Sequence, residues 1–277
     1  MIILLNKFLN IILIYGWYYE LKKKYLSNGE IMFQDVTSSE LQHARYSMDR
    51  FMLCYKFASD EVLTKIKILQ EEFNMLYSYN PIEHINSRVK TLESLMKKVK
   101  RRNIPFQLDA IRSEIKDIAG IRITCSFISN VYELSIMLQN QQDIVVLDYK
   151  DYISHPKANG YRSLHLILEI PVFLSDRVEK IPVEVQIRTI AMDFWASLEH
   201  KIYYKYKQEI PDNMLRELKE AATISTLLDQ KMEDLNKKVN NIKRFENYHV
   251  HPEEEFEPLN FYESFIAESK KAIQMQG

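Results

Sequence analysis

Residues 180–189 read KIPVEVQIRT, and the alternation in this stretch decides the fold. Successive side chains of a β-strand point to opposite faces of the sheet. The odd-numbered positions up to Ile187 are apolar, whereas Glu184, Gln186 and Arg188 occupy the even-numbered positions. The stretch therefore predicts a strand with one face in a hydrophobic core and the other lined by ionisable and hydrogen-bonding groups.

Two further stretches repeat this pattern. GIRITCSF (120–127) places Arg122 opposite an apolar face, and YRSLHLILEIPVF (161–173) places Tyr161 and His165 opposite a row of leucines. Such side chains are costly to order and are typical of sites, so a ligand-binding sheet face is favoured. A sheet with one face in water is the alternative.

Helical periodicity surrounds these strands. A long helix is predicted over 39–78, and a second helix from the Asn80-Pro81 break to about residue 102. The remaining predicted elements are a helix over 129–141, a strand over 144–152 and a helix over 190–206. Strands and helices in this order predict an α+β fold.

After Pro211 a long amphipathic stretch follows, with apolar residues at steps of three and four. Its apolar stripe consists of Leu218, Ala221, Ile224, Leu228, Met232, Leu235, Val239 and Ile242. A subunit interface is favoured, because so long a stripe is hard to cover with a small core. A helix packed on its own domain is the alternative.

Length, charge and cysteine content narrow the class of protein. The chain has 277 residues, 46% of them apolar, which suits one domain of roughly 200 residues plus extensions. A net charge of −1 provides no overall field for nucleic acid, so no DNA partner is expected. Two cysteines without metal-type spacing fit a reducing cytoplasm.

The amino-terminal residues 2–19 are apolar, but Asn6, Lys7 and Asn10 interrupt a run of marginal length, so membrane anchoring is not expected. Gly29-Glu30-Ile31 directly precedes Met32, and codons for Gly-Glu can form a ribosome-binding sequence. The hypothesis is that translation starts at Met32 and that residues 1–31 are not translated naturally.

Five ordered motifs make the chain resemble the RelA/SpoT-type (p)ppGpp synthetases, and within them a single-domain small alarmone synthetase. The motifs are SRVKTLESLMKK (87–98), KDIAGIRI (116–123), DYISHPKANGYRSLH (151–165), VEVQIRT (183–189) and DFWASLEHKIYYKY (193–206). The resemblance implies a nucleotidyltransferase-like mixed β-sheet with helices on one face, flanked by N- and C-terminal helices.

This resemblance also divides the chain. Residues 1–31 are the extension, 32–80 the N-terminal helices and 81–206 the catalytic domain. Residues 207–247 are C-terminal amphipathic helices for oligomerisation, and 248–277 an acidic tail. The resemblance further suggests a homotetramer, and leaves regulation by RNA or by bound alarmone open.

The implied activity is transfer of pyrophosphate from ATP to the 3′-hydroxyl of GDP or GTP, releasing AMP, in the stringent response to stress. No hydrolase activity is expected, because no histidine is followed by Asp. The preferred acceptor among GDP, GTP and GMP stays open. The alternatives are a toxin of this fold that pyrophosphorylates tRNA 3′ ends, and a non-catalytic nucleotide- or RNA-binding regulator.

Asp117 and Glu184 match the catalytic and metal positions of the family, which implies Mg²⁺ as cofactor. Glu184 is also expected to accept the proton of the attacking hydroxyl. Strict alternation would put Asp117 on the face of Ile121. Asp117 must therefore precede the strand, or Gly120 must mark a bulge.

The resemblance assigns Arg88 and Arg122 to the two faces of the adenine of ATP, and Lys90 and Lys98 to its phosphates. Steps of four between Lys90, Ser94 and Lys98 are expected to stack these side chains on one side of the predicted helix. Ser94 therefore joins the predicted ATP site.

For the guanosine nucleotide, Tyr161 is expected to stack on guanine, and Lys157 and His165 to meet phosphate oxygens. Gln186 is expected to support the acceptor ribose or phosphates. Asp193 stands where some relatives carry Asn, which leaves its contact with guanine open. The neighbouring Phe194 and Trp195 are interpreted as core residues.

Overall fold

The computed structural model describes residues 38–76, 79–205 and 211–249. The predicted extension of residues 1–31, and nearly all of the predicted acidic tail, lie outside these ranges. Residues up to Glu233 form one compact unit, and residues from Asp234 on form a second. The sheet and the candidate site belong to the first unit.

The described ranges contain six helices and a five-stranded mixed sheet. The strand order is β1-β2-β5-β4-β3, in which β2 and β5 are parallel and the other neighbouring pairs are antiparallel. The described elements are α2 (Ser38–Leu76), β1 (Ile82–Val89), α3 (Leu92–Arg101), α4 (Leu108–Glu114), β2 (Ala119–Cys125), α5 (Ile128–Gln139), β3 (Val145–Asp151), β4 (Leu164–Phe173), β5 (Val178–Thr189), α6 (Ile190–Lys205) and α7 (Asp212–His249). This arrangement confirms the predicted α+β class.

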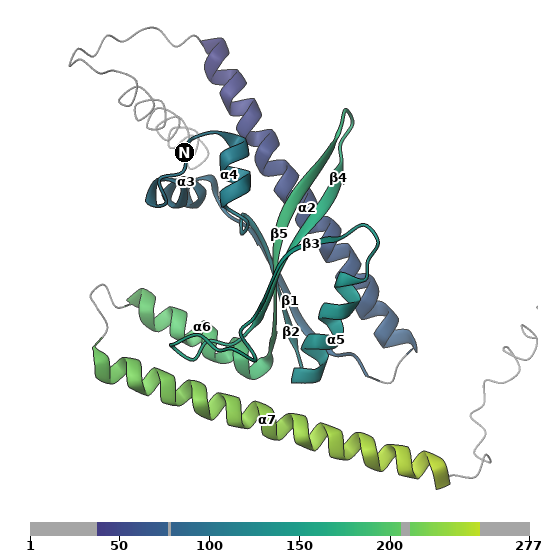
Figure 1. Ribbon diagram of the computed structural model, residues 1–277. Coiled ribbons are helices and arrows are strands. Elements are labelled where there is room, and N and C mark those ends of the chain that lie inside the picture. The colour runs from purple at the N-terminus through teal and green to yellow at the C-terminus, as the bar shows by residue number, and fades with distance from the viewer. Residues whose placement is uncertain (1–37, 77–78, 206–210, 250–277) are drawn as a thin grey trace, which may run out of the picture. The chain divides into compact units, whose positions relative to one another are not determined.

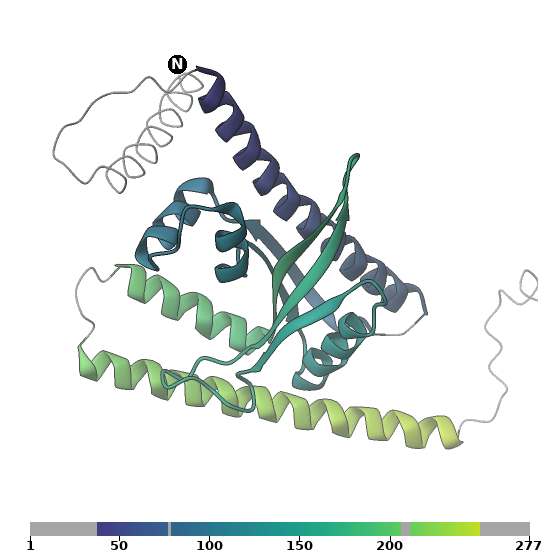
Figure 2. The ribbon, with the colours of Figure 1, turned by 45° about the horizontal axis from the view of Figure 1, so that its top comes forward.

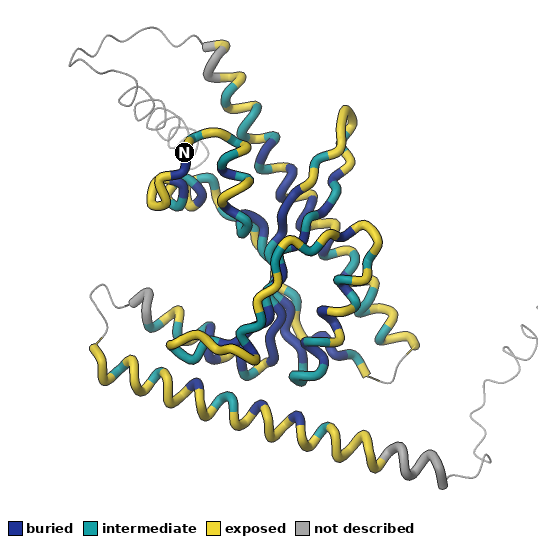
Figure 3. The backbone as a smooth tube through the Cα atoms, in the orientation of Figure 1, coloured by how far each residue is buried: buried dark blue, intermediate teal, exposed yellow. Residues whose placement is uncertain are grey.

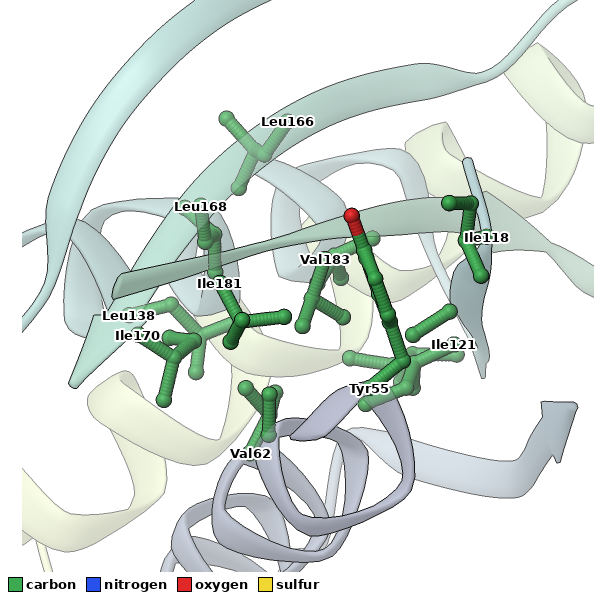
Figure 4. Close-up of a cluster of buried hydrophobic side chains, with 14 of the residues drawn as sticks. Tyr55, Val62, Ile118, Ile121, Leu138, Leu166, Leu168, Ile170, Ile181 and Val183 are labelled. Carbon is green, nitrogen blue, oxygen red and sulfur yellow. The ribbon is translucent and has the colours of Figure 1, made fainter. Parts of the chain in front are cut away.

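The apolar face of the sheet packs on α2 and α5, which lie on the same side of it (Figures 1 and 2). Figure 4 shows Tyr55 and Val62 of α2 and Leu138 of α5 meeting Ile181 and Val183 of β5. Each of these side chains is fully buried, and burying such a side chain stabilises the fold by about 1.5–3 kcal/mol. This packing gives β2, β4 and β5 their strict register.

The opposite face of the same strands is polar. Buried and half-buried positions alternate along β4, and β5 alternates in the same way from Val183 to Ile187 (Figure 3). The half-buried positions include His165, Glu184 and Gln186. The alternation read from the sequence is thereby confirmed, and it aims the candidate site residues away from the core.

The predicted helix over residues 81–102 is wrong in its first half, where β1 pairs antiparallel with β2 from Ile82 to Val89. A register shift between Ile82 and His84 adds a residue to the strand. The apolar residues Ile82, Ile85 and Val89 are therefore spaced by three and four, which imitates a helix. Only α3 is helical in this stretch.

Up to Glu233, helix α7 belongs to the first unit and buries polar side chains there. Asp229 and Glu233 are buried, and Asp229 accepts a hydrogen bond from Thr189 at 2.8 Å. In contrast, Ile224 and Leu228 are more than half exposed. Ile224 and Leu228 of the apolar stripe are thus left uncovered by the described residues of the first unit. None of the helices in the described ranges combines the length and the apolarity needed to cross a bilayer.

Candidate active site

The polar face brings together side chains from the three central strands. Arg122 on β2 pairs in register with Gln186 on β5, and Gln186 pairs in register with His165 on β4. Gly120 pairs with Glu184 one step further along. Residues that are distant in the sequence therefore become neighbours on one surface, as the sequence patterns predicted.

Asp117 lies just before β2, two residues ahead of its first residue, Ala119. Gly120 pairs in register with Arg88 of β1 and with Glu184 of β5, so it marks no bulge. Of the two explanations predicted for Asp117, its place ahead of the strand is therefore the correct one. From there the carboxylate shares a pocket with Glu184.

Two lysines hold the Asp117 carboxylate. Lys98 Nζ lies 2.6 Å from both carboxylate oxygens, and Lys90 Nζ lies 3.1 Å from Oδ2. Lys90 Nζ also donates to the backbone oxygen of Asp117 at 2.8 Å. Both ammonium groups, which the sequence assigned to ATP phosphates, thus converge on one candidate metal ligand.

The elements that carry these cations differ from the single predicted helix. Arg88 lies on β1, and Lys90 lies in the connection to α3, which begins at Leu92. Thr91 is the N-cap of α3 and accepts a hydrogen bond from the backbone N–H of Ser94. The Ser94 hydroxyl accepts from Thr91 Oγ1 at 3.0 Å, so Ser94 stabilises the helix start and is not among the residues that line the pocket.

Glu184 is held from two sides. His165 Nδ1 lies 3.3 Å from Glu184 Oε1, and Gln186 Nε2 donates to Glu184 Oε2 at 3.0 Å. Burial alone would raise the pKa of Glu184, but the hydrogen bonds from His165 and Gln186 outweigh it and lower the pKa. For Asp117, burial is likewise outweighed by Lys98 and Lys90, so its pKa is also lowered. Both acids are therefore ionised at neutral pH.

Tyr161 and His165 form the other end of the site. The Tyr161 hydroxyl lies 2.8 Å from His165 Nε2, and its ring lies edge-on to the imidazole. Lys157 Nζ lies 4.7 Å from the centre of the Tyr161 ring and 4.5 Å from that of Tyr152. The predicted guanine-site residues Lys157, Tyr161 and His165 are thus in direct contact.

The turn before β4 sets this geometry. The backbone N–H of Lys157 donates to the backbone oxygen of Tyr161, and the backbone N–H of Gly160 donates to the backbone oxygen of Lys157 at 2.8 Å. Gly160 has a φ of +89°, which a side chain would disfavour. The glycine therefore allows the tight turn that delivers Tyr161 to the polar face.

Arg188 is the site residue to which the sequence gave no role. Its guanidinium is buried and donates to the Tyr161 hydroxyl at 2.7 Å, to Gln186 Oε1 at 2.7 Å and to Asp193 Oδ1 at 3.1 Å. An arginine on the polar face of a buried strand was the available signal. Its partners could not be identified without knowledge of the strand order.

A pocket of about 240 Å³ lies on the side of β1 and β2. Among its lining residues are Arg88, Asp117, Arg122, Glu184 and Gln186. Within the described ranges, no group of three or more His, Cys, Asp or Glu side chains could hold a metal ion. A metal in this pocket would consequently need oxygen ligands from a substrate in addition to the two carboxylates.

The neighbouring aromatic residues separate into two environments. Trp195 is buried and donates to the Leu218 oxygen at 3.0 Å, which confirms its interpretation as a core residue. Phe194 is 65% exposed, so its interpretation as core is wrong. It lies on the first turns of α6, on the side that lines a groove with α7.

Known proteins are similar to this chain in sequence. The sequence profile described as "Region found in RelA / SpoT proteins" matches residues 87–209. GTP pyrophosphokinase YwaC of Bacillus subtilis is 51% identical over 188 residues, which cover 68% of this chain and 90% of the relative. GTP pyrophosphokinase YjbM of the same organism is 36% identical and covers 69% of this chain and 89% of that relative.

Solved structures agree with these matches. Small alarmone synthetase 2 of Bacillus subtilis superposes with a TM-score of 0.63 at 50% identity, covering 69% of this chain and 98% of the other. Small alarmone synthetase 1 of Bacillus subtilis, bound to its product pppGpp, gives 0.65 at 35% identity, covering 70% and 98%. Five motifs, one mixed sheet and relatives matched over nearly their full length therefore lead to one conclusion: the chain belongs to the RelA/SpoT family, and within it to the small alarmone synthetases.

Proposed function

We propose that the chain is a GTP pyrophosphokinase that transfers pyrophosphate from ATP to the 3′-hydroxyl of GDP or GTP. The 3′-oxygen attacks the β-phosphorus of ATP, the bond from that phosphorus to the α–β bridging oxygen breaks, and AMP leaves. The observation that carries this proposal is the pairing of two ionised acids, Asp117 and Glu184, in one pocket with Arg88 and Arg122. That combination suits a triphosphate donor next to an activated hydroxyl.

The donor half of the site is cationic. Arg88 and Arg122 line the pocket from adjacent strands, and each guanidinium offers a plane on which an adenine can stack. Lys90 and Lys98 lie at its edge on Asp117, from which a triphosphate can draw them. These four residues would bind ATP.

The acceptor half is formed by the Tyr161 turn and β4. The Tyr161 ring offers a stacking surface for guanine, and Lys157 and His165 next to it can meet phosphate oxygens. Gln186 lies between His165 and Arg122 in register, where it can reach the acceptor ribose or phosphates. The 3′-hydroxyl would then face Glu184.

Glu184 accepts the proton of the attacking hydroxyl. Its lowered pKa keeps it ionised before the nucleotide binds, and His165 holds one carboxylate oxygen in place. General-base catalysis of this kind contributes about 10²–10⁴-fold to a rate. The second oxygen is held by Gln186, which fixes the orientation of the carboxylate.

Asp117 and Glu184 would hold a Mg²⁺ ion, since both carboxylates are ionised, line one pocket and leave the remaining ligands to phosphate oxygens and water. When bound, Mg²⁺ neutralises negative charge on the triphosphate. Lys90 and Lys98 compensate the charge of Asp117 until then.

The exposed α7 stripe supports self-association of the chain, and the resemblance to the family suggests a homotetramer. A groove of about 880 Å³ runs between α6, α7 and the ends of β1 and β2, and Phe127, Ile190, Phe194, Ile224, Leu228 and Met232 are among its lining residues. Apolar surface of this extent is typical of an interface. Residues 207–247 would serve as the oligomerisation region, residues 81–206 as the catalytic domain and residues 32–80 as the N-terminal helices.

The cellular setting is the cytoplasm, where both nucleotides occur, and the role is the stringent response. Cys54 and Cys125 are both buried free thiols, as expected for a reducing compartment. Regulation by RNA or by alarmone would act on the assembled enzyme.

The test is incubation of the purified chain with Mg²⁺, ATP labelled on the β-phosphate, and either GDP, GTP, GMP or tRNA. A label transferred to the 3′ position of a guanosine nucleotide, together with AMP, is the expected result. Label on the tRNA 3′ end would instead identify a tRNA-modifying enzyme. Binding of nucleotides without any transfer would identify a non-catalytic regulator.

A further inference from the structure

The Asp193 carboxylate lies between two arginines from different strands. Arg188 Nη1 of β5 is 3.1 Å from Asp193 Oδ1, and Arg122 Nη1 of β2 is 3.3 Å from the same oxygen. Both guanidinium groups therefore share Oδ1. The carboxylate is 25% exposed, so it is open to an incoming ligand.

The two arginines belong to different halves of the site. Arg188 donates to the Tyr161 hydroxyl and to Gln186, both on the acceptor side. Arg122 lines the pocket with Arg88 and Asp117, on the donor side. Asp193 is therefore in contact with a cation of each half.

Arg122 depends on this carboxylate for its charge balance. Its guanidinium is half-buried, and Nε is a buried donor without a hydrogen-bond partner among the described residues. Burial and then the charge of Arg188 lower the pKa of Arg122, whereas Asp193 raises it. Without Asp193, two neighbouring arginines would repel each other, and Arg122 would lose the contact that fixes its plane.

We infer that Asp193 is a positioning residue for the ATP site: through Oδ1 it orients the Arg122 guanidinium for adenine, while the partly exposed carboxylate stays open to the guanine base. This inference rests on the proposed function and extends it, because the side chain assigned to the acceptor then serves both nucleotides. An asparagine in its place keeps a neutral acceptor for guanine but loses the charge that holds two arginines.

The test is calorimetric titration with AMPCPP in the presence of Mg²⁺ and without any guanosine nucleotide. AMPCPP is an ATP analogue whose α–β linkage cannot be cleaved, so no pyrophosphate is transferred. Asp193→Asn is expected to weaken AMPCPP binding about fivefold or more, since it removes charge-assisted contacts to Arg122. Arg122→Ala is expected to weaken it at least as much. The double variant is expected to match Arg122→Ala alone, because Asp193 acts through Arg122.

Asp176→Asn is the matched control, since Asp176 also pairs with two arginines, Arg50 and Arg177, and lies in the turn between β4 and β5 outside the site. It is expected to leave AMPCPP affinity unchanged. Asp193→Glu, which keeps the charge, is expected to bind AMPCPP more tightly than Asp193→Asn. In turnover at saturating GDP, Asp193→Asn is expected to raise the KM for ATP with little change in kcat.

An AMPCPP affinity of Asp193→Asn within twofold of wild type would overturn the inference, as would additive losses in the double variant. Should Asp193→Asn fail to fold in a thermal melt, Asp193→Glu and Arg122→Ala decide the question by the same titration. If wild type forms product but Asp193→Asn binds AMPCPP normally, only this inference fails. If wild type forms no product from ATP and GDP, the proposed function fails, whatever the titration shows.

Discussion

At the scale of single residues, the charges of the site are already paired with one another. Lys98 and Lys90 compensate Asp117, His165 contacts Glu184, and the two arginines share Asp193. A nucleotide phosphate or base could take the place of the acidic partner of each of these cations. On the proposed function, substrate binding would exchange ion pairs and would not expose bare charges, which would keep its electrostatic cost low.

The first prediction concerns Asp117, whose pKa is lowered in the folded chain. A lowered pKa stabilises the fold above the unfolded value of about 3.9, and this contribution is lost as the pH falls through the folded pKa. Asp117→Asn is therefore expected to reduce the unfolding free energy by about 1–3 kcal/mol at pH 7. The difference from wild type should shrink at pH 3, as urea unfolding at both pH values will measure. A difference that grows on acidification would show that the lysines do not hold an ionised Asp117.

The second prediction concerns the Tyr161 ring. Because stacking of a base on an aromatic ring is worth about 1–3 kcal/mol, Tyr161→Ala is expected to raise the KM for GDP by about 5- to 150-fold. Tyr161→Phe keeps the ring and loses only the contacts of the hydroxyl to His165 and Arg188, so its effect should be smaller. Steady-state kinetics with GDP varied at saturating ATP will compare them. Equal KM values for Tyr161→Ala and wild type would remove the ring from guanine binding.

At the scale of single residues, how much of the site can be predicted from the sequence depends on the type of contact. Alternation placed Glu184, Gln186 and His165 on one face, because the direction of a side chain on a strand is a local property. The contacts of Arg188 with Tyr161 and Asp193 depend on how β4, β5 and α6 meet, which no local pattern encodes. Motif resemblance supplied the candidate roles, and the structure supplied the partners.

At the scale of elements, the turn that carries Tyr161 packs against α7. A Cβ atom added at Gly160 would lie 2.5 Å from the Cβ of Ala222, in a backbone conformation with a φ of +89°. The turn therefore has neither the conformational freedom nor the space for a side chain.

The third prediction follows from this packing. Gly160→Ala is expected to destabilise the chain by at least about 1–2 kcal/mol from the backbone conformation alone, and to raise the KM for GDP by displacing Tyr161. Ala222→Gly in addition should recover part of the loss, because it removes the close approach but not the φ strain. Thermal unfolding and kinetics of the single and double variants will measure both effects. A Gly160→Ala chain as stable as wild type would refute the tight packing.

Helices and strands were predicted correctly where the apolar residues of a stretch recur with a single spacing. The sequence predicted α2 because Phe51, Tyr55 and Ile66 recur at helical spacing, and all three are buried. It missed β1 because the register shift near Ile82 gave an edge strand helical spacing. It also missed α4, a seven-residue helix without a side-chain cap that is too short to show a period.

At the scale of the whole molecule, the part of α7 up to Glu233 buries polar side chains and leaves apolar ones such as Ile224 and Leu228 exposed. Buried Asp229 and Glu233 hold the helix to Thr189 and Ser129. We propose that a second copy of the chain packs on the exposed stripe. The pattern of apolar residues alone could not distinguish this arrangement from a helix packed by its stripe.

The fourth prediction tests that arrangement. Leu228 is 57% exposed and lines the groove, so Leu228→Glu is expected to leave the fold intact and to reduce the assembly to smaller species. Gln230→Glu introduces the same charge at an exposed position outside the stripe and should leave the assembly unchanged. Light scattering coupled to gel filtration will report the masses. Unchanged mass for Leu228→Glu would show that the stripe serves another purpose.

The most direct measurement is a crystal structure of Glu184→Gln with AMPCPP, GDP and Mn²⁺ in place of Mg²⁺, since anomalous scattering locates the metal. We expect the metal to bind Asp117 and the AMPCPP phosphates, and the adenine to lie between Arg88 and Arg122. We expect the guanine of GDP to stack on the Tyr161 ring, with the 3′-hydroxyl of GDP facing residue 184. Nucleotides bound away from this face, or a metal remote from Asp117, would contradict it.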